Sequence, residues 1–216
     1  MVKITVIIAS LMRPSLQQTL ASLRLQNIEY ILFIRNDPSV SEYESRQMAV
    51  KDVTTPYIAF LDDDAYYDSS DVLARACHYL DTYTIIDGAI VGNMFGSGRQ
   101  DRLDLPMLGA GTALFMRTDA FNAVGGFKVE WGKEPGDGWR LDTVLLWDIV
   151  RKYGIASYKH CSDIVVRHPN PMQSHFNEKI ERKMYENYRE ECEKYIMPID
   201  PRIRMFAEKW KNEAKS

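Results

Sequence analysis

The sequence lacks the features by which disulfide-rich, membrane-spanning and nucleic-acid-binding proteins are recognised. Only three of its 216 residues are cysteines, and the odd number and wide spacing of Cys77, Cys161 and Cys192 indicate neither a disulfide framework nor a zinc motif. No stretch of about 18 or more apolar residues is present, so no segment qualifies as a transmembrane helix. A net charge of -3 argues against generic binding to nucleic acid or anionic membranes. We therefore expect a soluble, cytoplasmic protein with reduced cysteines.

What the sequence does contain is the pattern of one α/β domain. Its hydrophobic share of 45% and charged share of 26% are ordinary for a chain with a buried core. Apolar β-branched runs alternate with helical patterns over the first hundred residues, which predicts a mostly parallel sheet flanked by helices. The predicted strands cover residues 2–9, 29–37, 54–61, 89–95 and 111–117. Helical spacing is found around residues 16–23, 42–52, 71–80 and 141–154, and the last forty residues are also expected to be helical.

Three consecutive carboxylates, Asp62, Asp63 and Asp64, follow the apolar strand 54–61. Ligands gather at the carboxyl ends of strands in open α/β sheets. Carboxylates this close repel one another unless a cation is present, and Mg²⁺ or Mn²⁺ would satisfy them through oxygen ligands. A solvated acidic turn leading into a helix N-cap explains the same residues. The run by itself leaves both interpretations open.

Four segments together carry a family resemblance, which extends over roughly residues 2–168. They are residues 4–26, 45–64, 109–127 and 138–154. Their order and spacing resemble the GT-A-type nucleotide-sugar glycosyltransferases, in particular the inverting group called family two. The resemblance implies a GT-A, Rossmann-like domain over residues 1–172. Residues 173–216 would then form a C-terminal helical extension packed on the same domain.

The resemblance gives the acidic run a metal role. In that family a DxD motif ends a strand and holds the ion that bridges the donor diphosphate, which assigns Asp62 and Asp64 as metal ligands and Asp62 and Asp63 to the donor site. His168 follows an apolar strand and precedes Pro169, where relatives supply a histidine as third ligand. Imidazole suits Mn²⁺ better than Mg²⁺. We therefore expect Mn²⁺ or Mg²⁺ as cofactor.

The nucleotide half of the site is expected at the first two strand ends and on the helix before the third strand. The resemblance assigns Arg13, Asn36, Asp37 and Arg46 to it. Asp37 can accept from a base imide or a ribose hydroxyl, and the two arginines can donate to a base carbonyl or a phosphate. Pro38 interrupts the family pattern, so whether Asn36 or Asp37 matches stays open.

The small residues Gly109, Ala110 and Gly111 lie where the resemblance places the donor sugar. Small side chains let the backbone approach a ligand closely. We expect these residues to form the floor beneath the sugar.

An inverting transfer needs a base that deprotonates the acceptor hydroxyl. Asp142, at a helix start and twelve residues before Gly154, matches the Asp of the family's Glu-Asp pair, although Leu141 replaces the Glu. Asp137 in the preceding loop is the alternative base. Asp142 also has a purely structural interpretation, in which it caps the N-terminus of the helix.

The acceptor side is the least specific part of the sequence. Trp131 and Trp139 flank the loop that carries Asp137 and could stack on an acceptor, although core packing explains them equally well. The basic residues of the C-terminal helices, Arg202 among them, are balanced by acids, which is typical of a solvated face. The acceptor could be a glycan, a lipid-linked sugar, a protein, a small molecule or a modified nucleic-acid base.

We therefore expect a metal-dependent inverting glycosyltransferase that moves a sugar from a nucleotide-diphosphate donor, UDP-sugars first, to an acceptor hydroxyl. A nucleotidyltransferase would need a glycine-rich loop after the first strand, and residues 11–18 contain no glycine. A degenerate sugar-nucleotide-binding module remains an alternative because the Glu before Asp142 is missing.

Overall fold

The computed structural model describes residues 2–92, 101–131, 140–169 and 177–213. The first half contains β1 (Ile4–Ala9), α1 (Leu16–Arg24), β2 (Ile31–Arg35), α2 (Glu42–Val50), β3 (Tyr57–Phe60), β4 (Tyr66–Tyr67), α3 (Val72–Leu80), β5 (Ile85–Gly92) and β6 (Asp101–Leu103). The second half contains the short helical turn η1 (Gly111–Ala113), β7 (Leu114–Arg117), α4 (Thr118–Val124), η2 (Val129–Trp131), α5 (Leu141–Tyr153), η3 (Ile155–Ser157), β8 (Tyr158–His168), α6 (Glu178–Asn187), α7 (Arg189–Glu191), η4 (Cys192–Ile196) and α8 (Pro201–Glu213).

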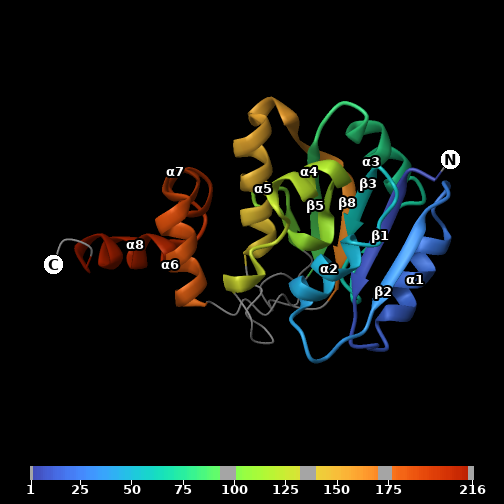
Figure 1. Ribbon diagram of the computed structural model, residues 1–216, viewed down its shortest axis with the longest axis horizontal. Coiled ribbons are helices and arrows are strands. Elements are labelled where there is room, and N and C mark those ends of the chain that lie inside the picture. The colour runs from blue at the N-terminus through green and yellow to red at the C-terminus, as the bar shows by residue number, and fades with distance from the viewer. Residues whose placement is uncertain (1, 93–100, 132–139, 170–176, 214–216) are drawn as a thin grey trace.

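The strands form one mixed sheet in the order β2-β1-β3-β7-β5-β8-β4, with β6 paired to β5 (Figure 1). β1 is parallel to β2 and β3, and β5 is parallel to β8. β7 is antiparallel to both β3 and β5. The sheet is thus more mixed than predicted, because the chain turns back after β5 and enters β7 from the carboxyl end of the sheet. The predicted α/β class is confirmed, while the first three residues of the strand predicted at 111–117 form η1.

The sheet separates two apolar cores. Along the central strand β1, Ile7 faces one core and Val6 and Ile8 face the other, as the alternation of side chains along a strand requires. The core around Ile7 is covered by α2, α4 and α5, and the opposite core by α1 and α3. Near-continuous burial on both faces explains why five of the six residues of β1, all except Thr5, are apolar rather than alternating with polar residues.

Helix α5 forms as the sequence predicts. Leu141, Val144, Leu145 and Ile149 are completely buried against the sheet. Gly154 ends the helix with a φ of +85°, a conformation that a side chain disfavours. Because this buried face packs α5 on the sheet, the start of the helix lies at the carboxyl edge of the sheet, where the acidic run also lies.

Glycine in β5 allows this strand to pair closely with β8. Gly92 lies opposite His168 in the parallel register, and a Cβ added at Gly92 would lie 1.9 Å from the carbonyl oxygen of His168. A Cβ at Gly88 would lie 2.6 Å from the carbonyl oxygen of Ile164. The two glycines therefore fix how far the end of β8 approaches the rest of the sheet.

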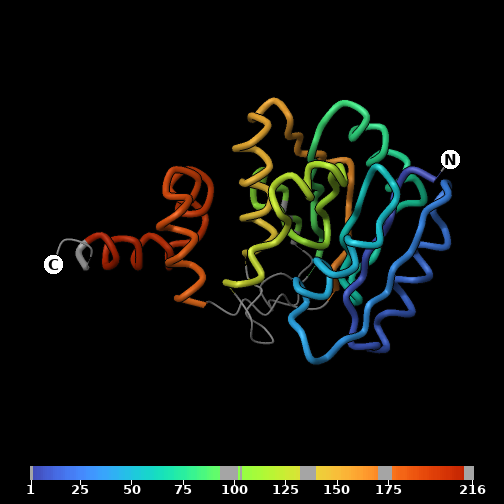
Figure 2. Tube along the Cα trace, viewed as in Figure 1, coloured from blue at the N-terminus to red at the C-terminus, as the bar shows by residue number. Residues whose placement is uncertain are grey.

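The C-terminal elements lie beyond α5, at the opposite end of the molecule from the N-terminus (Figures 1 and 2). Ile180, Met184, Tyr188 and Cys192 form the buried stripe predicted from their spacing of four; Phe176, predicted with them, lies outside the described residues. The hydroxyl of Tyr188 donates to Asp148 Oδ1 of α5 at 2.5 Å. Its ring lies 5.8 Å from that of Trp147, so α6 and α5 share one core.

The composition predicts reduced cysteines and no transmembrane helix. All three cysteines are buried with free thiols, and burial raises the pKa of the Cys192 thiol to about 12. Among the described residues, no helix is long and apolar enough to cross a membrane.

We expect Tyr188→Ala to lower the free energy of unfolding by about 3 kcal/mol, because it removes a buried ring and a hydrogen bond between α6 and α5. Urea unfolding should remain one transition by tryptophan fluorescence and far-UV circular dichroism. Tyr153→Ala, at the exposed end of α5, is the control and should change stability by less than about 0.5 kcal/mol. Two separate transitions in the wild type would contradict a shared core.

Candidate active site

A cavity of about 540 Å³ opens at the carboxyl edge of the sheet. It is bounded by the end of β3, the end of β8, helix α2, the segment leading into η1 and the start of α5. Ligands of open α/β sheets bind at this edge. The cavity borders several residues that the sequence analysis singled out, namely Arg46, Asp62, Gly109, Ala110, Gly111, Asp142 and His168.

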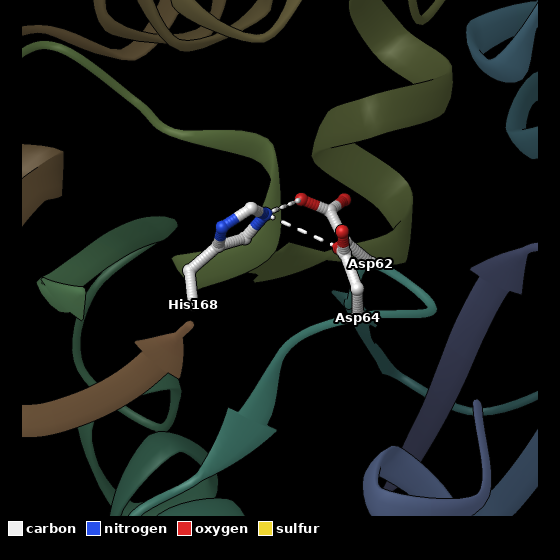
Figure 3. Close-up of side chains that lie close together, drawn as sticks. All are labelled: Asp62, Asp64 and His168. Carbon is white, nitrogen blue, oxygen red and sulfur yellow. Dashed lines mark ion pairs between the residues drawn. The ribbon is translucent and has the colours of Figure 1, made fainter. Parts of the chain in front are cut away.

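Asp62, Asp64 and His168 point toward one another in the position expected of metal ligands (Figure 3). One ligand atom from each residue lies within 4.8 Å of the others. His168 Nε2 is 3.2 Å from Asp64 Oδ1 and 3.5 Å from Asp62 Oδ2. Two carboxylates and an imidazole are a donor set that Mn²⁺ and Mg²⁺ accept, with the nitrogen favouring Mn²⁺.

Nearby positive charge stabilises the ionised carboxylates of this cluster. Burial would lower the pKa of His168, but its hydrogen bonds with Asp62 and Asp64 outweigh burial and raise the pKa to about 10. Burial alone would raise the pKa of Asp62, yet Arg46 and His168 hold it well below its usual range. Asp62 thus stays ionised, which is the state that a divalent cation requires of a carboxylate ligand.

Asp63 points into the protein rather than toward this cluster. Its Oδ2 accepts from the Ser10 hydroxyl at 2.8 Å, and its Oδ1 pairs with Arg13 Nη2 at 2.7 Å. Arg13 also lies 3.7 Å from Asp64 Oδ2 while its side chain is 56% exposed. Asp63 therefore ties the loop after β1 to the end of β3, and the contacts of Asp63 and Arg13 with a nucleotide stay predictions.

Arg46 lies completely buried between two carboxylates. Its Nη2 pairs with Glu42 Oε1 at 2.6 Å and contacts Asp62 Oδ1. Its guanidinium also lies 5.6 Å from the ring centres of Tyr43 and Phe60. Within the described part of the chain, its Nε and Nη1 have no hydrogen-bond acceptor. The residue is thus a buried donor beside the candidate metal cluster.

Glu42 is a site residue that the sequence analysis missed. It borders the cavity with its side chain 50% exposed, and the partial loss of solvent there raises its pKa despite the charge of Arg46. The only trace in the sequence is the spacing of four between Glu42 and Arg46, which is common on solvated helices.

Gly111 and Asp142 form one hydrogen-bonded unit. The Gly111 amide donates to Asp142 Oδ2 at 2.6 Å, and the Thr143 amide donates to Oδ1 at 2.8 Å. A Cβ added at Gly111 would lie 2.7 Å from Arg46 Nη1 and 3.3 Å from Asp142 Oδ2. A side chain at this position would therefore require the end of the Arg46 side chain to shift. Gly109 has a φ of +56°, which also favours glycine.

Burial raises the pKa of Asp142 to about 6, against the lowering effect of the two amides and of Arg46 and Arg140. A carboxylate with this pKa is ionised at neutral pH and accepts protons more readily than an exposed one.

The other predicted residues are placed apart from the described lining of the cavity. Asp37 accepts from the Ser39 amide at 3.1 Å and from its hydroxyl at 2.5 Å, so it closes its own turn beside Asn36. Trp131 packs on Tyr188, with ring centres 6.2 Å apart. Asp137 and Trp139 lie outside the described residues. The nucleotide and acceptor roles of these residues stay predictions.

The C-terminal segment contributes a wall of the cavity that was not expected. Ile199, Asp200 and Arg202 border it together with Arg140. Arg202 is nevertheless 44% exposed, so it borders the cavity from a solvated face, as the basic C-terminal residues were expected to do. Balanced charge in the sequence could not reveal this wall, because it depends on how the extension packs.

A second charged cluster supports the segment that leads into η1. His160 Nδ1 on β8 is 2.6 Å from Asp87 Oδ1 on β5, and Nε2 contacts Asp104. Tyr158 donates to Asp87 Oδ1 at 2.9 Å and accepts from the Met107 amide at 2.8 Å. These contacts fasten the chain at residues 104–107 to the sheet.

The hydrogen bond with Asp87 raises the pKa of His160 to about 9. A raised pKa contributes stability that is fully present below the unfolded value of about 6.5 and is lost as the pH rises through about 9. We expect the free energy of unfolding of the wild type to fall, relative to His160→Gln, by the order of 1 kcal/mol between pH 6.5 and 9.5, since solvent screens the pair. Urea titrations at several pH values measure this, with His78→Gln on α3 as the control. Parallel pH curves for wild type and His160→Gln would contradict it.

Comparison with known proteins supports the fold. No protein-family model matches the chain, and no curated protein matches its sequence. The structure of S. aureus TarS residues 1–349 in complex with UDP-GlcNAc has a TM-score of 0.63 at 14% identity, over 84% of this chain and 65% of that one. The corresponding complex with UDP has a TM-score of 0.61 at 14% identity, over 84% of this chain and 63% of that one.

A longer structure of S. aureus TarS has a TM-score of 0.59 at 13% identity, over 86% of this chain and 39% of that one. The present chain thus spans less than two thirds of the TarS chains to which it is similar. At this identity the likeness establishes the fold, and the Rossmann-like GT-A architecture that the sequence predicts is confirmed.

Proposed function

We propose that this chain is a metal-dependent inverting glycosyltransferase that moves a sugar from a nucleotide-diphosphate donor, with UDP-sugars favoured, to an acceptor hydroxyl. The observation that carries the proposal is the cluster of Asp62, Asp64 and His168, of which Asp62 and His168 border the cavity that Asp142 also borders. The fold shared with S. aureus TarS, whose structures hold UDP and UDP-GlcNAc, supports it.

The donor diphosphate would lie beside the candidate metal cluster and within reach of Arg46. A bound Mn²⁺ or Mg²⁺ would stabilise the negative charge of the leaving diphosphate as a Lewis acid. Arg46 Nε and Nη1, which lack acceptors among the described residues, are donors suited to a phosphate oxygen. The backbone at Gly109 and Gly111 would support the donor sugar, with Arg13, Asn36, Asp37 and the neighbouring Asp63 around the nucleotide.

Asp142 would act as the base. Its carboxylate is oriented by the amides of Gly111 and Thr143, and further lone pairs on its oxygens can accept the proton of an acceptor hydroxyl. That hydroxyl would attack the anomeric carbon from the side opposite the leaving diphosphate, which inverts the anomeric configuration. Asp137 is the competing candidate for this role.

The proposal also covers acceptor binding, the domain organisation and the location of the protein. Trp131, Trp139 and Asp137 would contribute to acceptor binding. The domain of residues 1–172 and the extension of residues 173–216 would fold as one unit, which the contacts of Tyr188 support. The buried free thiols are consistent with a reducing cytoplasmic location.

Titration calorimetry with UDP, GDP and dTDP, with and without Mn²⁺, tests the donor site. We expect one nucleotide to bind in the presence of Mn²⁺, and Asp64→Asn to weaken that binding by about tenfold or more, because a ligand of the ion is lost. Asp68→Asn, whose carboxylate pairs with Arg167 away from the cavity, is the matched control and should bind as the wild type does. Absence of nucleotide binding with the metal present would rule out the proposed donor site.

The pH dependence of turnover tests the base. Below pH 6 we expect kcat to fall about tenfold per pH unit, because Asp142 becomes protonated and can no longer accept a proton. Asp142→Asn should lower kcat by about a hundredfold or more while donor affinity stays close to that of the wild type. Asp148→Asn on the same helix is the control. Full turnover by Asp142→Asn would move the assignment to Asp137, and loss of donor affinity alone would make Asp142 a donor-binding residue.

A further inference from the structure

Arg140, immediately before α5, has a backbone conformation that arginine rarely adopts. Its φ is +73°, in the left-handed region. Such a conformation costs a residue with a side chain on the order of 1 kcal/mol or more, and it persists where surrounding contacts hold it. The contacts that hold Arg140 come from the C-terminal extension.

Two carboxylates from the extension hold the Arg140 side chain. Nε donates to Glu181 Oε1 on α6 at 3.2 Å, and Nη2 donates to Asp200 Oδ2 at 3.4 Å. Glu181 is completely buried, and the Arg140 side chain is 10% exposed. Asp200 also accepts from the Arg202 side chain at 2.9 and 3.0 Å. Burial would raise the pKa of Asp200, but Arg202 holds it below its usual range, so Asp200 carries a full negative charge toward Arg140.

The backbone of Arg140 sets the first turn of α5. Its carbonyl accepts from the Val144 amide at 2.9 Å, which is the first hydrogen bond of the helix. The turn so formed carries Asp142 and the Thr143 amide that orients its carboxylate. A shift of Arg140 would therefore move Asp142 relative to Gly111.

Arg140 also contributes charge at the cavity. Arg140, Asp142, Asp200 and Arg202 all border it. Asp142 additionally faces Arg46, Glu42 and Tyr43 on α2, and these groups are independent of the extension. The positive charge of Arg140 opposes the effect of burial on the Asp142 carboxyl.

We infer that Arg140 is a positioning residue: held by Glu181 and Asp200, it fixes the start of α5 and places a positive charge beside Asp142, so that the C-terminal extension controls the base. This inference rests on the proposed function, in which Asp142 accepts the acceptor proton. It gives the extension a part in the reaction that does not require contact with either substrate.

The test uses three variants of the full chain. Arg140→Gln removes the charge, Arg140→Gly removes both the side chain and the backbone strain, and Arg140→Lys keeps the charge. Arg151→Gln is the matched control, because Arg151 also joins α5 to the extension, through Glu191 at 2.6 and 2.7 Å, but at the far end of the helix. Thermal unfolding of each variant establishes that it is folded.

The first readout is the pKa of Asp142, followed by NMR of ¹³C-labelled aspartate carboxyls and assigned by the signal missing in Asp142→Asn. We expect the pKa to rise by about 0.5 unit or more in Arg140→Gln and Arg140→Gly, because an opposing positive charge is lost. It should stay near the wild-type value in Arg140→Lys and Arg151→Gln. An unchanged pKa in Arg140→Gln and Arg140→Gly would overturn the inference.

The second readout is turnover as a function of pH, together with donor affinity. Arg140→Gln and Arg140→Gly should lower kcat by about tenfold and move its acid limb to higher pH, with the Kd of the donor within about twofold of wild type. Weaker donor binding with an unmoved acid limb would make Arg140 a donor ligand and overturn the positioning role. If the wild type transfers no sugar, the proposed function fails, while the NMR titration still decides whether Arg140 controls Asp142.

Discussion

Three adjacent carboxylates at the end of one buried strand need positive charge, and the surrounding residues are arranged to supply it. Arg13 reaches residues 63 and 64 from the loop after β1. Arg46 reaches Asp62 from α2, and His168 reaches Asp62 and Asp64 from the end of β8. Because each of these groups lies on a different element, the acidic run draws the strand ends and α2 together at one edge of the sheet.

The same charge balance extends to the proposed base. Arg46 lies between Asp62 and the backbone of Gly111, and the Gly111 amide in turn binds Asp142. The candidate metal cluster of Asp62, Asp64 and His168 and Asp142 are therefore linked through one buried guanidinium and one glycine. A larger residue at position 111 would push against the end of the Arg46 side chain, which gives this glycine a packing role as well as the proposed one beneath the donor sugar.

The C-terminal extension supplies a second set of counter-charges at the cavity. Glu181 and Asp200 bind Arg140 at the start of α5, while Arg151 binds Glu191 near its end. Partly exposed ion pairs such as Arg151–Glu191 contribute little to stability. The buried pairs around Arg140 cost desolvation, which their attraction and hydrogen bonds must offset, so they are weak evidence for added stability and fit the proposed role of orienting Asp142.

The sequence by itself determined the elements whose pattern is local: the apolar strands β1 to β3, the inward face of α5, the Gly154 cap and the acidic run at the end of β3. Family resemblance added His168 and Asp142. The antiparallel direction of β7, the ion pair of Glu42 with the buried Arg46, and the cavity wall around Asp200 and Arg202 appear only in the tertiary structure. Periodicity reports which face of an element is buried, whereas contacts between residues far apart depend on the path of the chain and on how the elements pack.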